Sequence, residues 1–339
     1  MDTVKTAAPA WQTLPADDPF GPEVVLRTHG LTRSFGAVRA VEGLDLTVHA
    51  GEIYGFLGVN GAGKTTTIRM LMGIIKPDAG SIELLGQRTR RATIRQKQRI
   101  GYVSQEQPFY PWMTCRALGR FVGGLYPTWD AAEFDRLLRV FELPPARKVS
   151  QLSGGMKVKL ALALALASHP ALLILDEPTS GLDPVARREF IEMIHRQARQ
   201  HRRTTLFSSH LVDEVERVAD RVGVIHCGRM RYEGDLETLR GSVRRVRLPC
   251  MPPAPTIAAS DPSTDSSRPP AIPPPPADAF VLPSGFERLR DETGDGFRTL
   301  ILSAPPAAWE TLPFAQAEVS RLSLEDIFIA LVGNSASAL

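Results

Sequence analysis

The chain has 339 residues, 43% of them hydrophobic, which is enough for the core of one large globular domain and a smaller appendage. Its 40 basic and 37 acidic residues nearly balance, so the overall charge gives no reason to expect a nucleic-acid partner. The three cysteines are odd in number and widely spaced, which fits a reducing cytosol better than a disulfide framework.

The N-terminal part of the sequence predicts a tail followed by strands. Residues 1–22 lack a basic start followed by an apolar run, so we expect a disordered tail and no secretory signal. The runs 24–31 and 44–51 alternate polar and apolar residues and end at turn-forming residues, as strands of a mixed sheet do. Residues 52–58 resemble a buried strand, and residues 64–75 have the apolar spacing of a helix. A glycine-rich loop connects these two elements.

The middle of the chain alternates helices and strands. Residues 106–167 are rich in helical patterns and aromatic residues, and we expect an inserted helical subdomain whose last helix covers 156–167. A strand over 171–177, a helix over 184–200 and a strand over 204–210 follow. This alternation is typical of an α/β domain with a parallel sheet at its centre. The longest apolar stretch is interrupted and too short to span a bilayer, so we expect no membrane span.

The composition changes after residue 240, and we expect an accessory region over 241–339. Residues 249–283 are dense in proline, serine and alanine, which predicts a disordered linker. Two strands and a helix are expected around this linker, over 243–248, 296–303 and 323–333. The predicted architecture is a main α/β domain with a small C-terminal α+β appendage.

The strongest motif is "GVNGAGKT" at residues 58–65, which fits G-x-x-x-x-G-K-[ST] and lies between a predicted strand and a predicted helix. Its glycines let backbone N–H groups face phosphate oxygens, Lys64 reaches the β- and γ-phosphates, and Thr65 offers a hydroxyl to Mg²⁺. A glycine-rich turn that ends in lysine by chance is the alternative, and the flanking elements argue against it. We therefore expect ATP and Mg²⁺ as cofactors. The predicted nucleotide-binding residues of this loop are Gly58, Asn60, Gly61, Ala62, Gly63, Lys64, Thr65 and Thr66.

Two adjacent carboxylates, Asp176 and Glu177, end a predicted buried strand. Because side chains of neighbouring strand residues point in opposite directions, Asp176 can hold Mg²⁺ directly or through water, while Glu177 or the turn after it faces the attacking water as general base. Two acids that merely end a strand are the alternative, which the glycine loop upstream disfavours.

Gln105 and His210 follow two other predicted strands, at the sheet edge where ligands bind in open α/β folds. Gln105 suits contact with Mg²⁺ or water, and His210 suits contact with the γ-phosphate or the attacking water. Taken singly, each of them would more often be structural. The predicted catalytic residues are thus Lys64, Gln105, Glu177 and His210, and the predicted metal ligands are Thr65, Gln105 and Asp176.

A second candidate anion site lies at Ser153, Gly154 and Gly155, which open a predicted helix. The first N–H groups of a helix have no partner within it and favour an anion. A serine-capped helix with a glycine entry and no ligand is the alternative. One ATP cannot obviously use both helix starts within one chain. A dimer in which each chain covers the ATP of the other would use both.

Residues 23–240 resemble the nucleotide-binding subunit of ABC transporters. Six segments stand in the order of that family, namely "GVNGAGKTT", "VSQE", "LSGGM", "LLILDE", "SGLD" and "SSH". The resemblance implies a P-loop NTPase fold of the ABC type. Met156 and Phe35 depart from it, because glutamine and tyrosine are frequent at these positions, but neither substitution removes a phosphate ligand.

The same resemblance implies roles for single residues. Phe35 would stack on adenine, and Glu177 would be the catalytic base. Ser153 and Gly155 would bind the γ-phosphate held by the partner subunit, and Asp183 would help to form the dimer interface.

The segment "YPTWD" and the stretch from "KLALALALA" to "SGLDP" are similar to a bacterial exporter branch that includes antibiotic-efflux systems. This similarity implies an ATP-hydrolysing subunit on the cytoplasmic face of the cell membrane, acting as a homodimer or with a related ABC subunit. It would power export of a drug, antibiotic or lipid through a separate membrane permease. The permease would dock on the aromatic insert, although ordinary core aromatics are an equal alternative for Phe109, Tyr110, Pro111 and Trp112.

Two rival functions remain at this point. A soluble ABC ATPase acting on ribosomes or DNA is one, but its members usually carry two such domains or a long coiled coil, and neither is present. A regulatory binder that does not turn ATP over is the other, and the intact Lys64, Asp176, Glu177 and His210 speak against it.

Overall fold

The computed structural model describes residues 23–89, 92–249, 282, 284–294, 297–310 and 317–333. The predicted tail over 1–22 and nearly all of the predicted linker over 249–283 lie outside these residues. The linker prediction is wrong at its first residue, because Pro249 ends a strand. A proline is tolerated there since it sits at the end of the pairing ladder, opposite Phe297.

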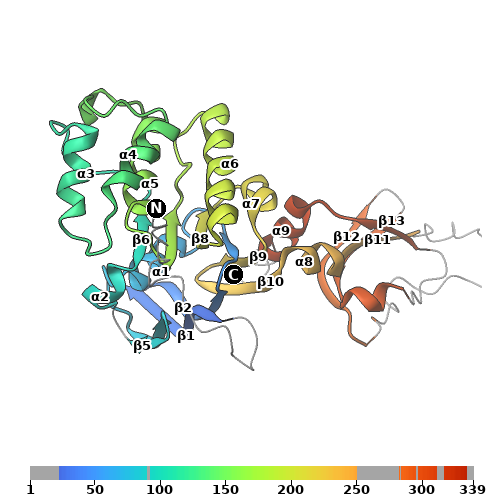
Figure 1. The fold of residues 1–339 in the computed structure, drawn as a ribbon. Helices are drawn as coiled ribbons and strands as arrows, with labels where there is room; N and C mark the ends of the chain where they lie inside the picture. Colours follow the sequence, from blue (N-terminus) through green and yellow to red (C-terminus); the bar gives the residue numbers. More distant parts are fainter. Residues whose placement is uncertain are drawn as a thin grey trace, which may run out of the picture.

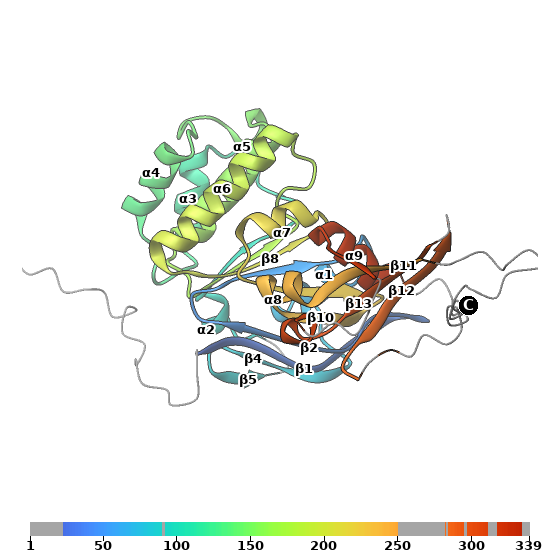
Figure 2. The same ribbon diagram turned by 90° about the vertical axis from the view of Figure 1, so that its right-hand side faces the viewer.

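An antiparallel sheet of four strands forms the base of the molecule, in the order β2-β1-β4-β5 (Figure 2). The long strands β1 and β2 pair across a tight turn at Gly36, where φ is 58°. Their alternating polar and apolar residues bury one side of the sheet. The strands are Val24–Phe35 (β1), Val38–His49 (β2), Ala79–Leu84 (β4) and Gln87–Thr89 (β5).

A second sheet of six strands lies at the centre, in the order β10-β9-β3-β8-β7-β6. All neighbours in it are parallel except β10, which pairs antiparallel with β9. Strands β3, β7 and β8 are buried along their whole length, as is usual for the inner strands of a parallel sheet. Strand β7 is apolar up to Asp176, whereas β8 buries two threonines and two serines around Leu206 and Phe207. The strands are Ile53–Leu57 (β3), Ile100–Val103 (β6), Leu172–Asp176 (β7), Thr204–Ser209 (β8), Arg221–His226 (β9) and Arg229–Asp235 (β10).

Helices cover both faces of the central sheet (Figure 1). Helix α1 packs between the two sheets, and Ile68 and Leu71 share one core with Leu46 and Ile174. Helices α3, α4 and α5 form a separate lobe beside α6. The helices are Lys64–Leu71 (α1), Ile94–Lys97 (α2), Cys115–Gly123 (α3), Ala131–Val140 (α4), Gly154–Leu166 (α5), Pro184–His201 (α6), Val212–Val218 (α7) and Leu236–Ser242 (α8).

Helix α1 is shorter than the predicted 64–75. It ends at Leu71 because Gly73 adopts a left-handed backbone with φ of 61°, which stops the helical ladder. Within the described ranges, no helix combines the length and the apolar character needed to cross a bilayer.

The C-terminal part forms a third, antiparallel sheet in the order β12-β13-β11-β14. Its helix α9 packs against α7 of the main domain, since Ile327 and Phe328 share one core with Val215 and Val218. The elements are Val243–Pro249 (β11), Glu287–Gly294 (β12), Phe297–Ser303 (β13), Glu318–Arg321 (β14) and Leu324–Gly333 (α9). The C-terminal appendage therefore rests directly on the central domain.

Glu52, just before β3, should make stability depend on pH. Burial raises the pKa of its carboxyl from 4.5 to about 7, although the His49 N–H donates to it at 2.8 Å. The folded state thus holds the Glu52 proton more tightly than the unfolded state, and stability is lost as pH rises from about 4.5 to 7. After solvent screening of this half-buried group, we expect Glu52→Gln to raise the free energy of unfolding by about 1–2 kcal/mol at pH 8.

Urea unfolding of the full chain and of Glu52→Gln at pH 4.5 and pH 8 measures this effect. The gain should be small at the lower pH, where the folded carboxyl is protonated and the unfolded one is only half ionised. An equal gain at both pH values would contradict the titration and point to a packing effect instead.

Candidate active site

The loop from Gly58 to Thr65 connects β3 to α1 and can be formed only with glycine at two positions. Gly63 has a φ of 112°, and a Cβ there would lie 2.5 Å from the Ala40 carbonyl oxygen. A Cβ on Gly58 would lie 2.6 Å from the Ile225 carbonyl oxygen. Because the N-cap Gly63 has no side chain, no side-chain acceptor occupies the first N–H groups of α1. The loop therefore fits a phosphate group.

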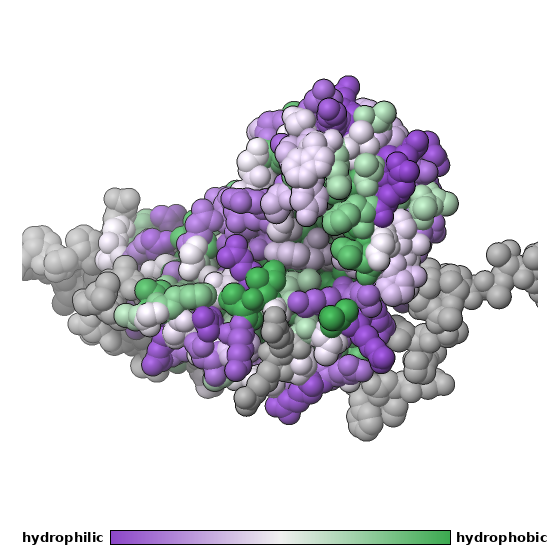
Figure 3. Space-filling view, turned by 90° about the vertical axis from the view of Figure 1, so that its left-hand side faces the viewer, coloured by the Kyte–Doolittle hydropathy of each residue, from purple (hydrophilic) through white to green (hydrophobic). Residues whose placement is uncertain are grey.

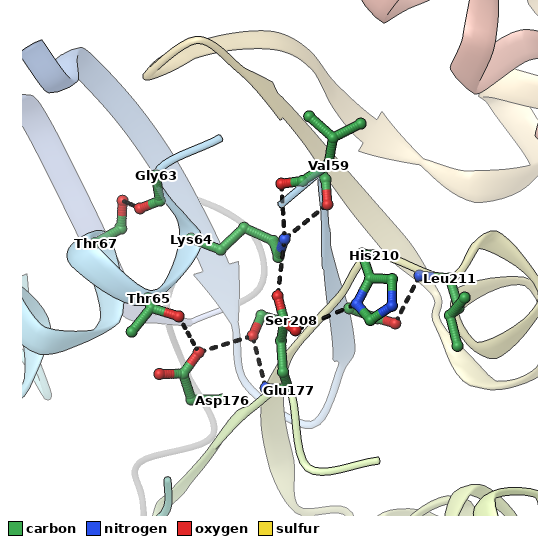
Figure 4. A network of polar contacts seen from close by, with 12 residues as sticks. Val59, Gly63, Lys64, Thr65, Thr67, Asp176, Glu177, Ser208, His210 and Leu211 are labelled. Carbon is green, nitrogen blue, oxygen red and sulfur yellow. Dashed lines mark hydrogen bonds and ion pairs between the residues drawn. The ribbon is translucent and has the colours of Figure 1, made fainter. Parts of the chain in front are cut away.

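The ammonium group of Lys64 is buried at the centre of a polar network (Figure 4). Its Nζ donates to the carbonyl oxygens of Gly58 at 2.6 Å and Val59 at 3.1 Å. The same Nζ lies 2.9 Å from Glu177 Oε1. Both partners of this ion pair are at least 90% buried, so each charge depends on the other.

Asp176 lies at the end of β7, beside the first residues of α1. Its Oδ1 accepts hydrogen bonds from Thr65 Oγ at 3.0 Å and from Ser208 Oγ at 3.1 Å. Burial raises the pKa of Asp176, and these two hydrogen bonds offset part of that effect. Hydroxyl and carboxylate oxygens are ligands that Mg²⁺ prefers. The described residues contain no group of three His, Cys, Asp or Glu side chains arranged for a metal, so an ion here would need phosphate or water oxygens as well.

Glu177 does not follow the strand geometry that its neighbour Asp176 keeps. Strand β7 ends at Asp176, and Glu177 has a left-handed backbone with φ of 43°. The alternation rule therefore does not apply, and both carboxylates contact the start of α1. The Glu177 N–H donates to Ser208 Oγ at 2.9 Å, and its Oε2 lies 3.2 Å from His210 Nδ1. Lys64 and His210 thus hold the two carboxylate oxygens of Glu177.

Gln105 is separated from this network in the structure. Strand β6 ends at Val103, and the exposed Gln105 lies two residues beyond it. No hydrogen bond between described residues joins it to Lys64, Thr65 or Asp176. Of the other loop residues, Asn60 and Gly61 are exposed, Ala62 is buried and Thr66 is partly buried.

Phe35 lies at the end of β1 with 47% of its surface exposed. The guanidinium of Arg33 lies 4.8 Å from the centre of its ring. An exposed aromatic face of this kind can accept a second flat ring, such as a nucleotide base.

The second helix start forms as the sequence predicts, but away from the loop. Ser153 is the N-cap of α5, and its Oγ accepts a hydrogen bond from the Met156 N–H at 3.2 Å. Gly154 is exposed, and no atom lies within 4 Å of where its Cβ would be. Among the described residues, no hydrogen bond joins Ser153, Gly154 or Gly155 to the loop at 58–65.

Asp183 is exposed and caps α6, since its Oδ1 accepts hydrogen bonds from the N–H groups of Val185 and Ala186. These hydrogen bonds lower the pKa of Asp183. Within one chain, Asp183 therefore serves as the N-cap of α6.

Ser208 is the site residue that sequence reasoning missed. Its hydroxyl donates to Asp176 and accepts from the Glu177 N–H, so it holds both acidic residues. Strands β7 and β8 pair with Asp176 directly opposite Ser208. Aligning "LLILD" with "TTLFSS" in this register would have shown the contact.

Comparisons with known proteins point to one family. The family model described as ABC transporter matches residues 41–180. The bacitracin transport ATP-binding protein BcrA of Bacillus licheniformis is 39% identical over 223 residues, which are 65% of this chain and 73% of that protein. The Nod factor export ATP-binding protein I of Burkholderia lata is 43% identical over 211 residues, 60% of this chain and 68% of that protein.

A solved structure of an ATP binding subunit of an ABC transporter aligns with a TM-score of 0.58 and 29% identity, covering 64% of this chain and 92% of that one. The predicted P-loop NTPase fold of the ABC type is thereby confirmed. The chain belongs to the ATP-binding proteins of ABC transporters.

Proposed function

We propose that this chain hydrolyses ATP with Mg²⁺ and thereby powers export of a small molecule through a separate membrane subunit. The observation that supports hydrolysis most directly is Glu177, whose carboxylate lies between Lys64 and His210 at the end of the phosphate loop. The named functions of two relatives, bacitracin transport and Nod factor export, support small-molecule export. They favour this function over a soluble ABC ATPase that is not coupled to transport.

The residues of the network divide the chemistry among them. Thr65 and Asp176 would hold Mg²⁺, which supplies positive charge that neutralises phosphate oxygens. Lys64 would exchange its ion pair with Glu177 for one with phosphate. That exchange frees Glu177 Oε1 to accept a proton from water, as a general base must. His210 keeps the other oxygen of Glu177 in place. Phe35 would stack on the adenine, and Gln105 would contact Mg²⁺ or water once its loop moves toward them.

The start of α5 supports a dimer as the active unit, with a second copy or a related ABC subunit. Ser153, Gly154 and Gly155 form a helix N-terminus, and no hydrogen bond between described residues joins it to the loop of the same chain. We infer that they bind the γ-phosphate held by the opposing subunit, with Asp183 at the interface. Each ATP site would then consist of a loop from one chain and a helix start from the other.

A group of exposed aromatic residues supports docking of the membrane subunit on the helical lobe, on the cytoplasmic face of the membrane. Tyr110 lies 5.2 Å from Trp112 and 5.6 Å from Phe121 between ring centres. These three residues are 43%, 65% and 48% exposed, so they are not core aromatics. Phe109, in contrast, packs against the core. Figure 3 shows hydrophobic residues along the face of this lobe, between more polar areas.

Phosphate release by the purified chain with MgATP tests this function. We expect Lys64→Ala to lower the rate by at least about 100-fold, because the loop loses its only charged phosphate ligand. The exposed Lys76, just beyond α1, gives a matched control, and Lys76→Ala should keep the rate. Since Lys64→Ala also leaves Glu177 without its cation, thermal unfolding must confirm that the variant folds. Equal rates in the folded variant and the wild type would overturn the proposal.

A further inference from the structure

Glu214 carries a buried carboxylate that the roles proposed so far do not use. It lies in the first turn of α7 and is only 2% exposed. Its Oε2 accepts a hydrogen bond from Ser209 Oγ at 2.5 Å, and its Oε1 lies 3.6 Å from Arg187 Nε. Burying a carboxylate is costly unless its partners compensate. Ser209 and Arg187 are the groups that compensate for burying Glu214.

The hydroxyl of Ser209 links Glu214 to the backbone on the other side of His210, at Leu211. The Ser209 Oγ donates to Glu214 and accepts from the N–H of Leu211 at 3.0 Å. The Ser209 carbonyl oxygen accepts from the N–H of Gly58 at 3.2 Å. The residues on either side of His210 are thus fixed by one hydroxyl, while the backbone of Ser209 is tied to the phosphate loop.

Arg187 connects the same carboxylate to the segment that leads into α6. Its Nη2 donates to the Leu182 carbonyl oxygen at 3.4 Å. Leu182 precedes Asp183, which we place at the dimer interface. A chain of polar contacts therefore runs from Leu182 through Arg187, Glu214 and Ser209 to the Leu211 N–H, and His210 lies between Ser209 and Leu211 in the sequence.

Helix α7 gives Glu214 a rigid base. Val215 and Val218 of α7 are buried in one core with Ile327 and Phe328 of the C-terminal helix α9. Because α7 is packed on this side, the Glu214 carboxylate can fix the more exposed turn at His210, whose side chain is 34% exposed.

We propose that Glu214 is a positioning residue for ATP hydrolysis. Its carboxylate holds Ser209 and thereby orients His210 toward Glu177, and its ion pair with Arg187 links this orientation to the segment at Leu182. The inference rests on the proposed hydrolysis. The side-chain oxygen of Glu214 keeps the Ser209 O–H pointing to it, which leaves an oxygen lone pair for the Leu211 N–H. Without this acceptor, the hydroxyl can rotate, and the turn that presents His210 loses its constraint.

Kinetics of four variants test the proposal. We expect Glu214→Ala to lower kcat by about 10- to 30-fold while KM for ATP changes by less than about twofold, because only the arrangement of His210 is disturbed. Glu214→Gln should restore most of kcat, since its amide oxygen still accepts from Ser209. Ser209→Ala should lower kcat by a similar factor to Glu214→Ala, and it replaces Glu214→Ala in the test if Glu214→Ala does not fold. The neighbouring Asp213 is exposed, so Asp213→Ala is the matched control with wild-type kinetics.

Combining Glu214→Ala with His210→Ala separates positioning from a general structural effect. If Glu214 acts through His210, the double variant should be no slower than His210→Ala alone. Losses that multiply in the double variant, or an unchanged kcat in Glu214→Ala, would overturn the proposal.

A second measurement does not depend on turnover. In NMR spectra of the histidine rings, Glu214→Ala should shift the His210 signal and leave the signal of the remote His29 unchanged. An unmoved His210 signal would overturn the positioning role even if wild-type chain released no phosphate. Failure of the wild type to hydrolyse ATP would overturn the proposed function separately.

Discussion

Replacing Glu177 with glutamine should abolish most phosphate release while ATP binding persists. Glutamine has the same shape, so its amide can still meet Lys64 and His210, and Lys64 keeps the carbonyl oxygens of Gly58 and Val59. What the variant loses is a group that can accept a proton from water. General bases typically contribute about 10²- to 10⁴-fold, and we expect a fall in kcat within that range.

Two measurements and one control check this result. Phosphate release gives the turnover, and binding of a fluorescent ATP analogue shows that the loop still works. In the presence of ATP, the variant should also accumulate as a dimer in size-exclusion chromatography, since hydrolysis no longer separates the chains. Glu142 is exposed and shares the left-handed backbone of Glu177, with φ of 57°, so Glu142→Gln is the matched control. Wild-type turnover in Glu177→Gln would refute its assignment as base.

The sequence was sufficient for those parts of the site that depend on local structure. The loop at 58–65 follows a buried strand, has glycines where a Cβ would clash with the backbone, and leads into a helix. Each of these features is encoded within a few residues. The alternation of strands and helices likewise predicts a parallel sheet at the centre, and β3, β8 and β7 pair in parallel.

Features that depend on distant pairing could not be predicted. Strands β9 and β10 were not predicted, although β9 is largely apolar and β10 alternates charged residues with Met230 and Tyr232. What the pattern does not give is their place beside β3 in the central sheet. The separation of the strands into two sheets depends on which strands pair, and the sequence pattern does not state that.

The direction of the Glu177 side chain depends on one backbone angle after the end of β7. A strand rule cannot foresee this left-handed turn, which brings the carboxylate to Lys64. Gln105 lies two residues beyond the end of β6, is exposed, and makes no hydrogen bond to Lys64, Thr65 or Asp176 among the described residues. The side-chain direction of a residue just beyond the end of a strand is therefore the feature that the sequence predicts least well.

Two inactive variants should restore activity when mixed, if each ATP site is shared between chains. Gly155→Asp places a negative charge at the start of α5, where the partner's γ-phosphate would bind. The fold should tolerate it, because the new Cβ would lie 3.7 Å from Ala186 and 3.8 Å from Leu182, which is ordinary contact. Alone, both Gly155→Asp and Glu177→Gln should be close to background in phosphate release.

In a mixed dimer, one site combines both defects while the other combines the intact loop of one chain with the intact α5 start of the other. With random pairing, half of the dimers are mixed and each has one working site, so about a quarter of wild-type activity should return. A chain carrying both substitutions provides the control, since its mixed dimers with wild type have no working site, and at equal amounts it should lower wild-type activity to about a quarter, not to the half expected from dilution. If the mixture is no more active than its parts, each chain holds a complete site and the role of Ser153 to Gly155 as a partner contact is wrong. If activity returns, it should also fall on dilution, because the working site exists only while two chains are together.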